Sequence, residues 1–250
     1  MKTALVTGAT AGFGLAICKL LLQSGYRVIG TGRRAERLSE LHLQFGDNFL
    51  PLVFDIQDSS EVEKALNSRP QSWQKIDLLV NNAGLALGLE PAHKADLTDW
   101  YQMIDTNIKG LVTMTRLVLP EMVEHNSGHI INIGSIAGTY PYPGGNVYGG
   151  TKAFVKQFSL NLRADLAGTK VRVSNVEPGL CGGTEFSNVR FKGDDEKAAK
   201  IYENVEFVRP EDVANIVLWL NQQPEHVNIN RVEVMPVAQT SSALNVARNL

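Results

Sequence analysis

The sequence predicts an α/β protein with a single-domain, Rossmann-like fold, in which a doubly wound parallel sheet is covered by helices on both faces. Short runs of apolar and β-branched residues alternate along the 250 residues with longer segments of helical periodicity. Strands that are each followed by a helix pair in parallel, and such a sheet is buried on both faces. No linker, low-complexity tract or solenoid repeat divides the chain. We therefore expect one domain over residues 1–250.

The first half of the chain is predicted to hold strands at 3–7, 27–32, 49–56 and 76–84. The helices between them are predicted at 14–25, 35–46 and 59–68, and a longer one at 97–124. Gly25 and Gly46 mark the ends of the first two helices, and serines cap the third. Pro120 is expected to kink the long helix near its end, because proline lacks the N–H that a helix interior needs.

The second half continues the same rhythm, with strands predicted at 128–135, 171–179 and 231–237. A helix is predicted from the stretch VYGGTKAF (147–154) onward, and another at 210–222 with Pro210 near its start. The polar segment 181–208 interrupts the alternation of strands and helices. Long insertions of this kind in compact domains are commonly lids or binding loops, so we expect this segment to lie over the site.

Composition and charge exclude several classes of function. The formal net charge is −2, which gives no electrostatic basis for binding nucleic acid or an anionic membrane. No apolar run reaches the length of a membrane helix, and the start lacks the apolar core of a signal peptide. The two cysteines, Cys18 and Cys181, and the five histidines have no ligand spacing. We expect a cytoplasmic protein without a disulfide or a metal.

A glycine-rich stretch, VTGATAGFG, lies between the first predicted strand and the first helix. Glycine lets backbone amides approach a pyrophosphate, and the helix N-terminus adds partial positive charge. The spacing is G-x-x-x-G-x-G, and a purely structural turn is the alternative reading. In this context we predict a dinucleotide site formed by Gly8, Ala9, Thr10, Ala11, Gly12, Phe13 and Gly14.

The end of the second strand points to NADP as the coenzyme. An NAD site usually offers a carboxylate to the ribose 2′-hydroxyl at this position. Here the strand runs into Arg33 and Arg34 with no acid before them. A guanidinium can bind a 2′-phosphate through two parallel hydrogen bonds. The alternative is a solvated basic pair on a loop.

Polar residues also end the next two strands. Asp55, with Ile56 beside it, is predicted to contact the adenine, although capping of the next turn explains Asp55 equally well. Asn81 and Asn82 are expected to bond backbone at the sheet edge, and Asn81 is the predicted ribose contact.

Tyr148 and Lys152 lie four residues apart on a predicted helix and therefore on one face. A phenol titrates near ~10, too high for acid–base work at neutral pH. One ammonium at about 4 Å, with an effective dielectric near 20, supplies roughly 4 kcal/mol, enough to lower that pKa by about 2–3 units. We predict that Tyr148 is a general acid/base tuned by Lys152. The alternative is a surface pair on an amphipathic helix.

The chain contains, in this order, Gly8-x-x-x-Gly12-x-Gly14, NNAG (81–84), Asn107, Ser135, Tyr148-x-x-x-Lys152 and Pro178-Gly179. Together these motifs resemble those of the short-chain dehydrogenases/reductases, and the resemblance covers essentially the whole chain. The resemblance implies that Ser135 stabilises the substrate oxygen and that Asn107 holds a water in a proton relay from Lys152. It places Pro178, Gly179, Leu180 and Thr184 beside the nicotinamide. Thr184 stands one residue later than in many members. A homotetramer is also implied.

Longer stretches, including GGNVYGGTKAFVKQFSLNLR and EPGLCGGTEFSNVRFKGDD, are similar to a bacterial branch of this family that oxidises small 3-hydroxy acids with NADP. Serine, L-allo-threonine and 3-hydroxypropionate are the implied substrate type. Arg190 is the predicted clamp for the substrate carboxylate, or else a solvated charge on the loop. A reductase of 3-oxoacyl thioesters and a noncatalytic NADP-binding sensor are the rival functions.

Overall fold

The computed structural model describes residues 1–241, so residues 242–250 of the predicted domain lie outside the described part. Over 1–241, seven parallel strands form a sheet in the order β3-β2-β1-β4-β5-β6-β7. The strands are β1 (Thr3–Thr7), β2 (Arg27–Gly32), β3 (Phe49–Val53), β4 (Leu78–Asn81), β5 (Gly128–Ile133), β6 (Val171–Pro178) and β7 (Arg231–Val234). The predicted α/β fold with a doubly wound parallel sheet is confirmed.

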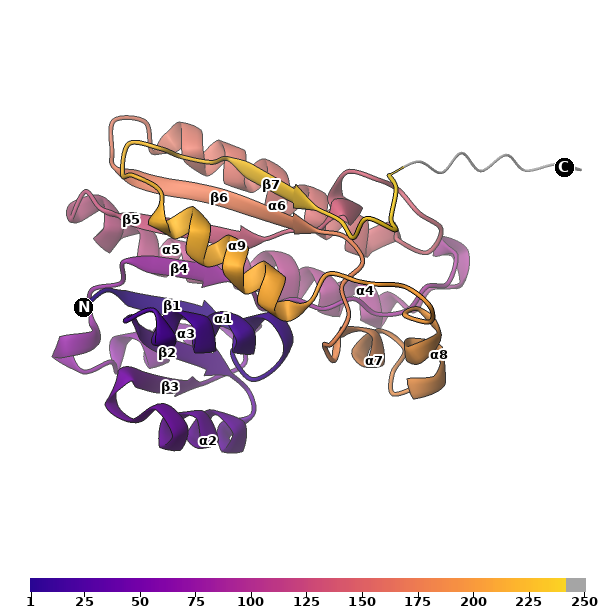
Figure 1. Ribbon diagram of the computed structural model, residues 1–250, viewed down its shortest axis with the longest axis horizontal. Helices are drawn as coiled ribbons and strands as arrows, with labels where there is room; N and C mark the ends of the chain where they lie inside the picture. Colours follow the sequence, from indigo (N-terminus) through magenta and orange to yellow (C-terminus); the bar gives the residue numbers. More distant parts are fainter. Residues whose placement is uncertain (242–250) are drawn as a thin grey trace, which may run out of the picture.

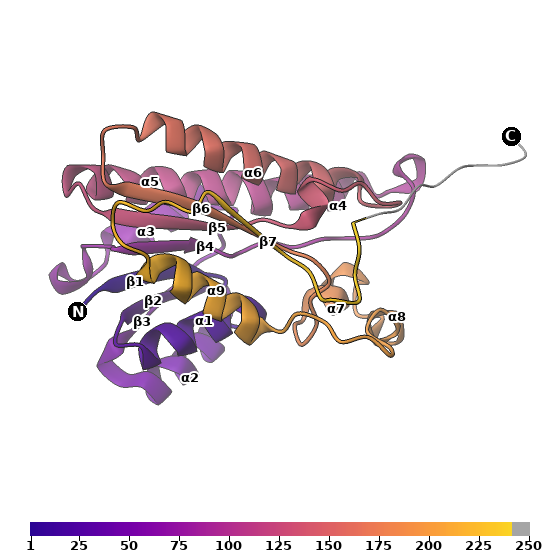
Figure 2. The ribbon, with the colours of Figure 1, turned by 45° about the horizontal axis from the view of Figure 1, so that its top comes forward.

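Helices cover both faces of this sheet (Figure 1). They are α1 (Gly12–Gln23), α2 (Ala35–Phe45), α3 (Ser59–Asn67), α4 (Leu97–Ile104), α5 (Leu111–Glu124), α6 (Asn146–Asp165), α7 (Phe186–Arg190), α8 (Asp195–Lys200) and α9 (Pro210–Gln222). Figure 2 shows α5 and α6 on one side of the sheet and α1, α2 and α9 on the other. The short helices α7 and α8 belong to the predicted insertion and lie beyond one end of the strands.

The two larger apolar clusters of the core lie on opposite faces of the sheet. Successive side chains of a strand point to opposite faces, so Val6 of β1 packs in the cluster of α1, α2 and α9, and Leu5 in that of α3, α5 and α6. Every residue of β1 is buried. Burial on both faces explains why β1, with the sequence TALVT, contains no charged residue.

Some predicted boundaries are wrong, for identifiable reasons. The third strand ends at Val53 because its neighbour β2 ends at Gly32, the pairing partner of Val53. Asp55 and Ile56 therefore lie beyond the sheet. The predicted helix 97–124 is divided into α4 and α5 by a π-helical turn, Asp105–Gly110. Pro120 lies inside α5, which continues to Glu124.

The connections create a crevice at the carboxyl ends of the strands. The chain moves outward from β1 to β3 and then returns to β4, which pairs with the other side of β1. Open α/β sheets bind ligands where the strand order reverses in this way. Separately, none of the helices in the described part of the chain has both the length and the apolar character to cross a membrane.

Candidate active site

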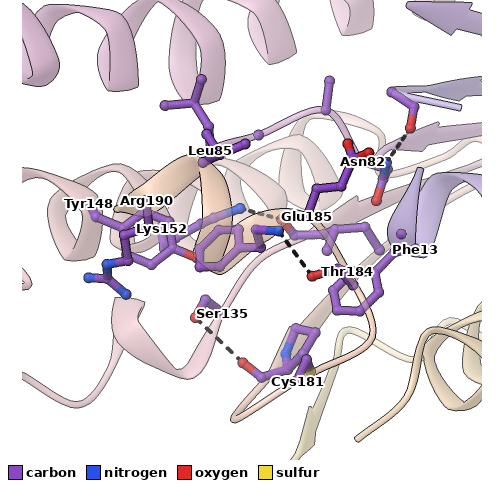
Figure 3. A pocket seen from close by; sticks show the side chains of 18 of the residues that line it. Phe13, Asn82, Leu85, Ser135, Tyr148, Lys152, Cys181, Thr184, Glu185 and Arg190 are labelled. Carbon is purple, nitrogen blue, oxygen red and sulfur yellow. Dashed lines mark hydrogen bonds between the residues drawn. The ribbon is translucent and has the colours of Figure 1, made fainter. Parts of the chain in front are cut away.

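A cavity of about 710 Å³ lies at this end of the sheet. Its lining includes the glycine-rich loop, the residues that follow β2 to β6 and the insertion. Figure 3 shows Tyr148, Lys152 and Arg190 grouped at one end, with Phe13 and Asn82 at the other. The cavity thus brings together the predicted coenzyme loop and the predicted catalytic residues, which come from distant parts of the sequence.

The glycine-rich loop has the conformation expected of a phosphate cradle. Gly8 and Gly12 have positive φ angles of 69° and 51°, which other residues rarely adopt. A Cβ on Gly14 would collide with the carbonyl oxygen of Gly8. Helix α1 begins at Gly12, and its N-cap residue Ala11 provides no side-chain cap. The first N–H groups of the helix remain available for an anion, so the loop fits a dinucleotide pyrophosphate.

The two predicted 2′-phosphate ligands differ in their surroundings. Arg34 donates from Nε and Nη2 to Thr10 Oγ1 at 3.0 and 2.7 Å, and its Nη1 pairs with Glu185 at 2.7 Å. Arg33 pairs only loosely with Asp55, at 3.6 Å, and its side chain is 61% exposed. Asp55 also accepts a bond from the N–H of Gln57 at 3.0 Å. Both Asp55 and Ile56 line the cavity.

The asparagine pair after β4 is divided between the core and the cavity. Asn81 is buried and donates to Thr115 Oγ1 at 2.9 Å and to Asn132 Oδ1 at 2.8 Å. It does not line the cavity, because its side chain points to the face covered by α5. Asn82 does line it and donates to the carbonyl oxygens of Thr7 and Gly8. The structure therefore places Asn82, and not Asn81, at the wall of the cavity.

Tyr148 and Lys152 are both buried and lie in the first half of α6. Lys152 Nζ donates to the carbonyl oxygen of Ile133 at 2.8 Å and lies 5.8 Å from the centre of the Tyr148 ring. Burial lowers the pKa of Lys152 to about 8. The sequence argument expected Lys152 to lower the pKa of Tyr148. Instead, burial raises the pKa of Tyr148 and outweighs the opposing influence of the Ser135 hydroxyl. Within the protein, Tyr148 is therefore a neutral, protonated phenol.

Ser135 follows β5 and has two roles. Its Oγ caps the short turn Ile136–Gly138 by accepting from the N–H of Ala137 at 3.1 Å. The same hydroxyl lies within hydrogen-bonding reach of Tyr148 and donates to the carbonyl oxygen of Pro178 at 3.4 Å. Ser135 thus lies between the tyrosine and the loop after β6.

Asn107 lies in the π-helical turn between α4 and α5 and is buried. Its Oδ1 accepts from the N–H of Leu85 at 2.9 Å, and its Nδ2 donates to the carbonyl oxygen of Leu85 and to Thr151 Oγ1. These bonds join the loop after β4 to α6. A Cβ on Gly84 would lie 3.2 Å from Asn107 Oδ1 and 3.5 Å from Lys152 Nζ, so the two side chains meet at this glycine.

The residues predicted to lie beside the nicotinamide, Pro178, Gly179, Leu180 and Thr184, all line the cavity. The N–H of Leu180 donates to Gln239 Oε1 at 2.7 Å, which fixes the loop after β6. Thr184 Oγ1 accepts from the N–H of Phe186 at 3.2 Å. Its methyl carbon lies 3.1 Å from the position of a Cβ on Gly12, so the insertion contacts the glycine-rich loop directly.

Arg190 lies at the end of α7 and points into the cavity beside Tyr148. Its guanidinium carbon is 5.6 Å from the centre of the Tyr148 ring. Nη2 donates to the Tyr142 hydroxyl at 2.6 Å, and Nε donates to the carbonyl oxygen of Gly88 at 3.3 Å. Arg190 is therefore a positioned cation at the tyrosine end of the cavity, and not a solvated charge.

Sequence reasoning missed several residues at or beside the site, namely Arg37, Glu185, Phe186 and Gln239, and it named Asn82 only as a residue that bonds backbone. Arg37 could have been found, because it lies three residues after Arg34 and so on the same helix face. Glu185 directly follows the predicted ligand Thr184 but carries no motif. Within residues 1–241, no three His, Cys, Asp or Glu side chains come together in a way that could hold a metal ion.

Known proteins resemble this chain closely. A family profile described as short chain dehydrogenase matches residues 2–195. A probable NADP-dependent dehydrogenase from Haemophilus influenzae is 77% identical over 246 residues, which cover 98% of each chain. An NADP-dependent 3-hydroxy acid dehydrogenase from Escherichia coli is 63% identical over 244 residues, with 98% of each chain covered. A serine 3-dehydrogenase from Agrobacterium fabrum is 49% identical over 246 residues, again with 98% of each covered.

Among solved structures, the closed form of a serine dehydrogenase complexed with NADP⁺ superposes with a TM-score of 0.98. It is 62% identical, and the match covers 99% of this chain and 100% of the other.

Proposed function

This chain belongs to the short-chain dehydrogenase family, and from that premise we propose that it is an NADP-dependent oxidoreductase acting on small 3-hydroxy acids. It interconverts the 3-hydroxyl and the 3-oxo group of acids such as serine, L-allo-threonine and 3-hydroxypropionate. The observation that carries the proposal is the convergence of Ser135, Tyr148, Lys152 and Arg190 in the cavity that also contains the glycine-rich loop. The names of the close relatives support the same reaction.

The coenzyme contacts that we propose follow the shape of the cavity. Gly8, Gly12 and Gly14 leave room for backbone amides to bind the pyrophosphate. Arg33, which is largely free of protein partners, binds the 2′-phosphate. Asn82 would hold the ribose, and Pro178 to Leu180 would hold the nicotinamide, since all of them line the cavity. Bound NADP gives or takes the hydride, and the remaining steps are performed by the side chains of this chain.

Tyr148 is the proton donor in reduction and the proton acceptor in oxidation. Because burial keeps its phenol protonated, it can donate to the substrate oxygen as negative charge develops there. Ser135 donates a second hydrogen bond to the same oxygen and stabilises that charge. In the oxidation direction, the positive charge of the oxidised nicotinamide favours the phenolate. Lys152, with a pKa of about 8, is able to exchange a proton near neutral pH.

Arg190 selects a substrate that carries a carboxylate. Its guanidinium lies beside the Tyr148 ring, so the carboxylate and the reacting carbon of a short acid can reach both groups at once. A 3-oxoacyl thioester lacks this charge next to the reacting carbon. The position of Arg190 therefore favours free hydroxy acids over the thioester reductase alternative. A pure NADP-binding sensor would have no need of Arg190, Ser135 and Tyr148 together.

The test is a spectrophotometric panel with both coenzymes. Serine, L-allo-threonine and 3-hydroxypropionate are each offered with NADP⁺ and NAD⁺, and 3-oxoacyl thioesters are offered with NADPH. We expect turnover of the free acids with NADP⁺ and little or none of the thioesters. Turnover of thioesters alone would favour the reductase, and saturable NADPH binding without any turnover would favour the sensor.

We further propose that the enzyme is cytoplasmic, as its two free cysteines suggest, and a homotetramer with contacts through α4, α5 and α6, as the family resemblance implies. Val123 and Leu160 of these helices are 40% and 43% exposed, which supports an interface there. Light scattering coupled to gel filtration measures the mass. A monomer at micromolar concentration would contradict this assembly.

A further inference from the structure

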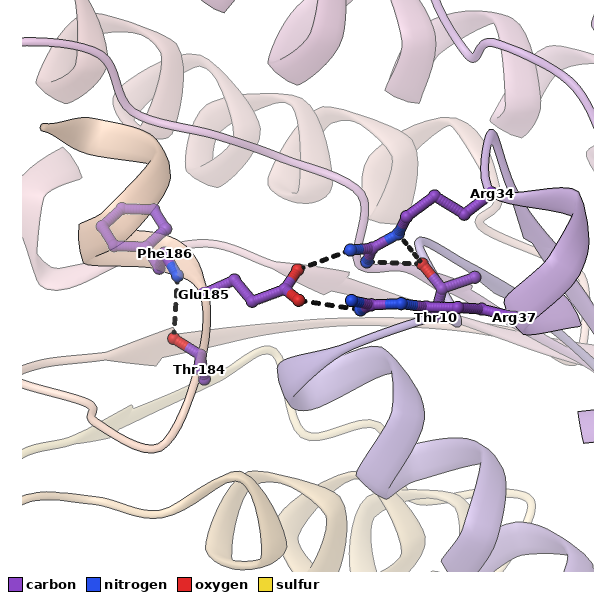
Figure 4. Close-up of polar contacts among 6 residues, drawn as sticks. All are labelled: Thr10, Arg34, Arg37, Thr184, Glu185 and Phe186. Atoms are coloured by element: carbon purple, nitrogen blue, oxygen red, sulfur yellow. Dashed lines mark hydrogen bonds and ion pairs between the residues drawn. The ribbon is translucent and has the colours of Figure 1, made fainter. Parts of the chain in front are cut away.

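The insertion is joined to the opposite wall of the cavity by a carboxylate between two guanidinium groups (Figure 4). Glu185 Oε2 pairs with Arg34 Nη1 at 2.7 Å, and Glu185 Oε1 pairs with Arg37 Nη1 at 2.7 Å. The glutamate is 151 residues from Arg34 and 148 from Arg37 in sequence. These contacts therefore link the start of α2 to the start of α7 across the cleft between the glycine-rich loop and the insertion.

Both sides of this link are anchored. Arg34 is held by its two bonds to Thr10, and Thr10 belongs to the glycine-rich loop. Glu185 follows Thr184, which packs against Gly12 of the same loop. An ion pair whose side chains are already positioned loses less conformational entropy on forming than one between two free side chains.

The insertion has a base held by backbone hydrogen bonds. Its ends are tied together, because Cys181 and Val208 form a parallel bridge. The N–H of Gly182 donates to the carbonyl oxygen of Val208 at 3.2 Å, and the N–H of Val208 donates to that of Leu180 at 3.1 Å. Gly183, with a φ of 69°, lies between this fixed base and Glu185. A glycine at that position can absorb the backbone rotation that opening requires.

We propose that Glu185 is a coenzyme-retention residue, which ties the insertion to Arg34 and Arg37 across the cleft and slows release of the bound dinucleotide. The inference rests on the proposed NADP site. It also separates the roles of neighbouring arginines: Arg33 binds the 2′-phosphate, and Arg34 with Arg37 holds the insertion closed. Partial burial acts to raise the pKa of Glu185, but the bonds from Arg37 and Arg34 outweigh it and hold that pKa below its ordinary value, so the carboxylate is charged at neutral pH.

The experiment measures NADPH release by stopped-flow fluorescence, with excess NADP⁺ as the chase. Glu185→Gln keeps the shape of the side chain and removes its charge. Glu196→Gln is the matched control, because Glu196 lies in the same insertion and pairs with Lys200 of its own helix. We expect release about threefold to tenfold faster from Glu185→Gln, as for the loss of exposed charged pairs, and a change of less than about twofold in the control.

A double variant separates retention from a general loosening of the insertion. If Glu185 acts through Arg37, then Glu185→Gln combined with Arg37→Gln releases NADPH about as fast as Glu185→Gln alone, since coupled sites are not additive. If the two substitutions increase the release rate by independent factors that multiply, the inference is overturned. It is also overturned if NADPH leaves Glu185→Gln no faster than it leaves the control. If the wild-type protein shows no saturable NADPH binding, the proposed function itself fails. If the wild-type protein binds NADPH but the variants do not change the release rate as expected, only the retention role fails.

Discussion

The floor and the roof of the cavity are built from different kinds of interaction. The floor consists of Ser135, Tyr148 and Lys152, which are held by buried bonds such as that from Lys152 to the carbonyl oxygen of Ile133. The roof is the insertion 181–208, which reaches the opposite wall through ion pairs whose side chains are 41–46% exposed. Buried, paired groups are costly to disturb, whereas exposed ion pairs contribute only about 0–1 kcal/mol each.

This difference separates the residues that carry out the reaction from those that control access to the cavity. The floor must keep proton-transfer groups within a few tenths of an ångström, so it is rigid and pKa values are shifted there. The roof must open for the coenzyme and substrate, so weak, polar contacts are suitable. Substitutions in the floor should therefore abolish turnover or change stability, and those in the roof should change binding and release.

The largest effect is expected for Tyr148→Phe, which removes the proton donor and leaves the ring in place. We expect kcat to fall by about 10²–10⁴-fold, the usual contribution of a general acid/base. NADPH binding should persist, because the glycine-rich loop is unchanged. Steady-state turnover and NADPH fluorescence measure the two quantities. The control is Tyr101→Phe, since Tyr101 is 59% exposed on α4. Turnover within tenfold of wild type would remove Tyr148 from the mechanism.

The second prediction concerns the pH dependence of stability at Lys152. Burial lowers its pKa from 10.5 to about 8, so in the window between these values the unfolded chain holds a proton that the folded protein does not. The free energy of unfolding then rises with pH, by at most about 1.4 kcal/mol per pH unit for this group. Below pH 8 the cost of the buried ammonium is constant.

The measurement compares wild type with Lys152→Met by urea denaturation from pH 7 to 10. Other titrating groups contribute equally to both proteins, so the difference isolates Lys152. We expect wild type to gain stability relative to the variant above pH 8. The opposite result is that the free energy of unfolding of wild type minus that of the variant stays constant or falls as the pH rises. Either outcome would mean that Lys152 keeps its proton in the folded state.

The sequence predicted the floor better than the roof. The periodicity of apolar residues predicted the parallel sheet, and the order of the family motifs predicted that Ser135, Tyr148 and Lys152 act together. The pairing of Glu185 with Arg37 was missed because it spans 148 residues, and no local pattern encodes such a contact. The position of Arg190 beside Tyr148 also depends on how the insertion folds back, which residue type alone cannot give.

Two errors about residues at the cavity have physical causes. The sequence argument placed Lys152 close enough to lower the pKa of Tyr148, but it did not include the burial of the phenol, which acts in the opposite direction and is larger. Asn81 was chosen over Asn82 for the cavity, although the N–H of Asn82 bonds back to Val80 and so turns the chain toward the site. Burial and local turns both depend on tertiary packing.

The third prediction tests the substrate end of the roof. Arg190→Gln removes the charge that faces the substrate, so we expect KM for free hydroxy acids to rise by about 10- to 100-fold, as for loss of a charged hydrogen bond. The value of kcat should change less, because Tyr148 and Ser135 remain. Lys192→Gln is the control, since Lys192 pairs with Asp99 at 2.9 Å and does not line the cavity. Unchanged KM in Arg190→Gln would exclude the carboxylate contact.

The smallest effect should come from a matched pair of glycine substitutions that measures how tightly the floor is packed. A Cβ on Gly138 would lie 2.7 Å from the carbonyl carbon and oxygen of Lys152, whereas a Cβ on Gly150 of α6 meets no atom within 4 Å. We expect Gly138→Ala to destabilise the protein by about 1–3 kcal/mol, and Gly150→Ala to stabilise it by about 0.5–1 kcal/mol, because helix interiors favour alanine. Urea denaturation measures both. Equal changes in the two variants would contradict the close contact between the turn after Ser135 and α6. The same contact predicts that Gly138→Ala, and not Gly150→Ala, lowers turnover, since only the first displaces the backbone that carries Lys152.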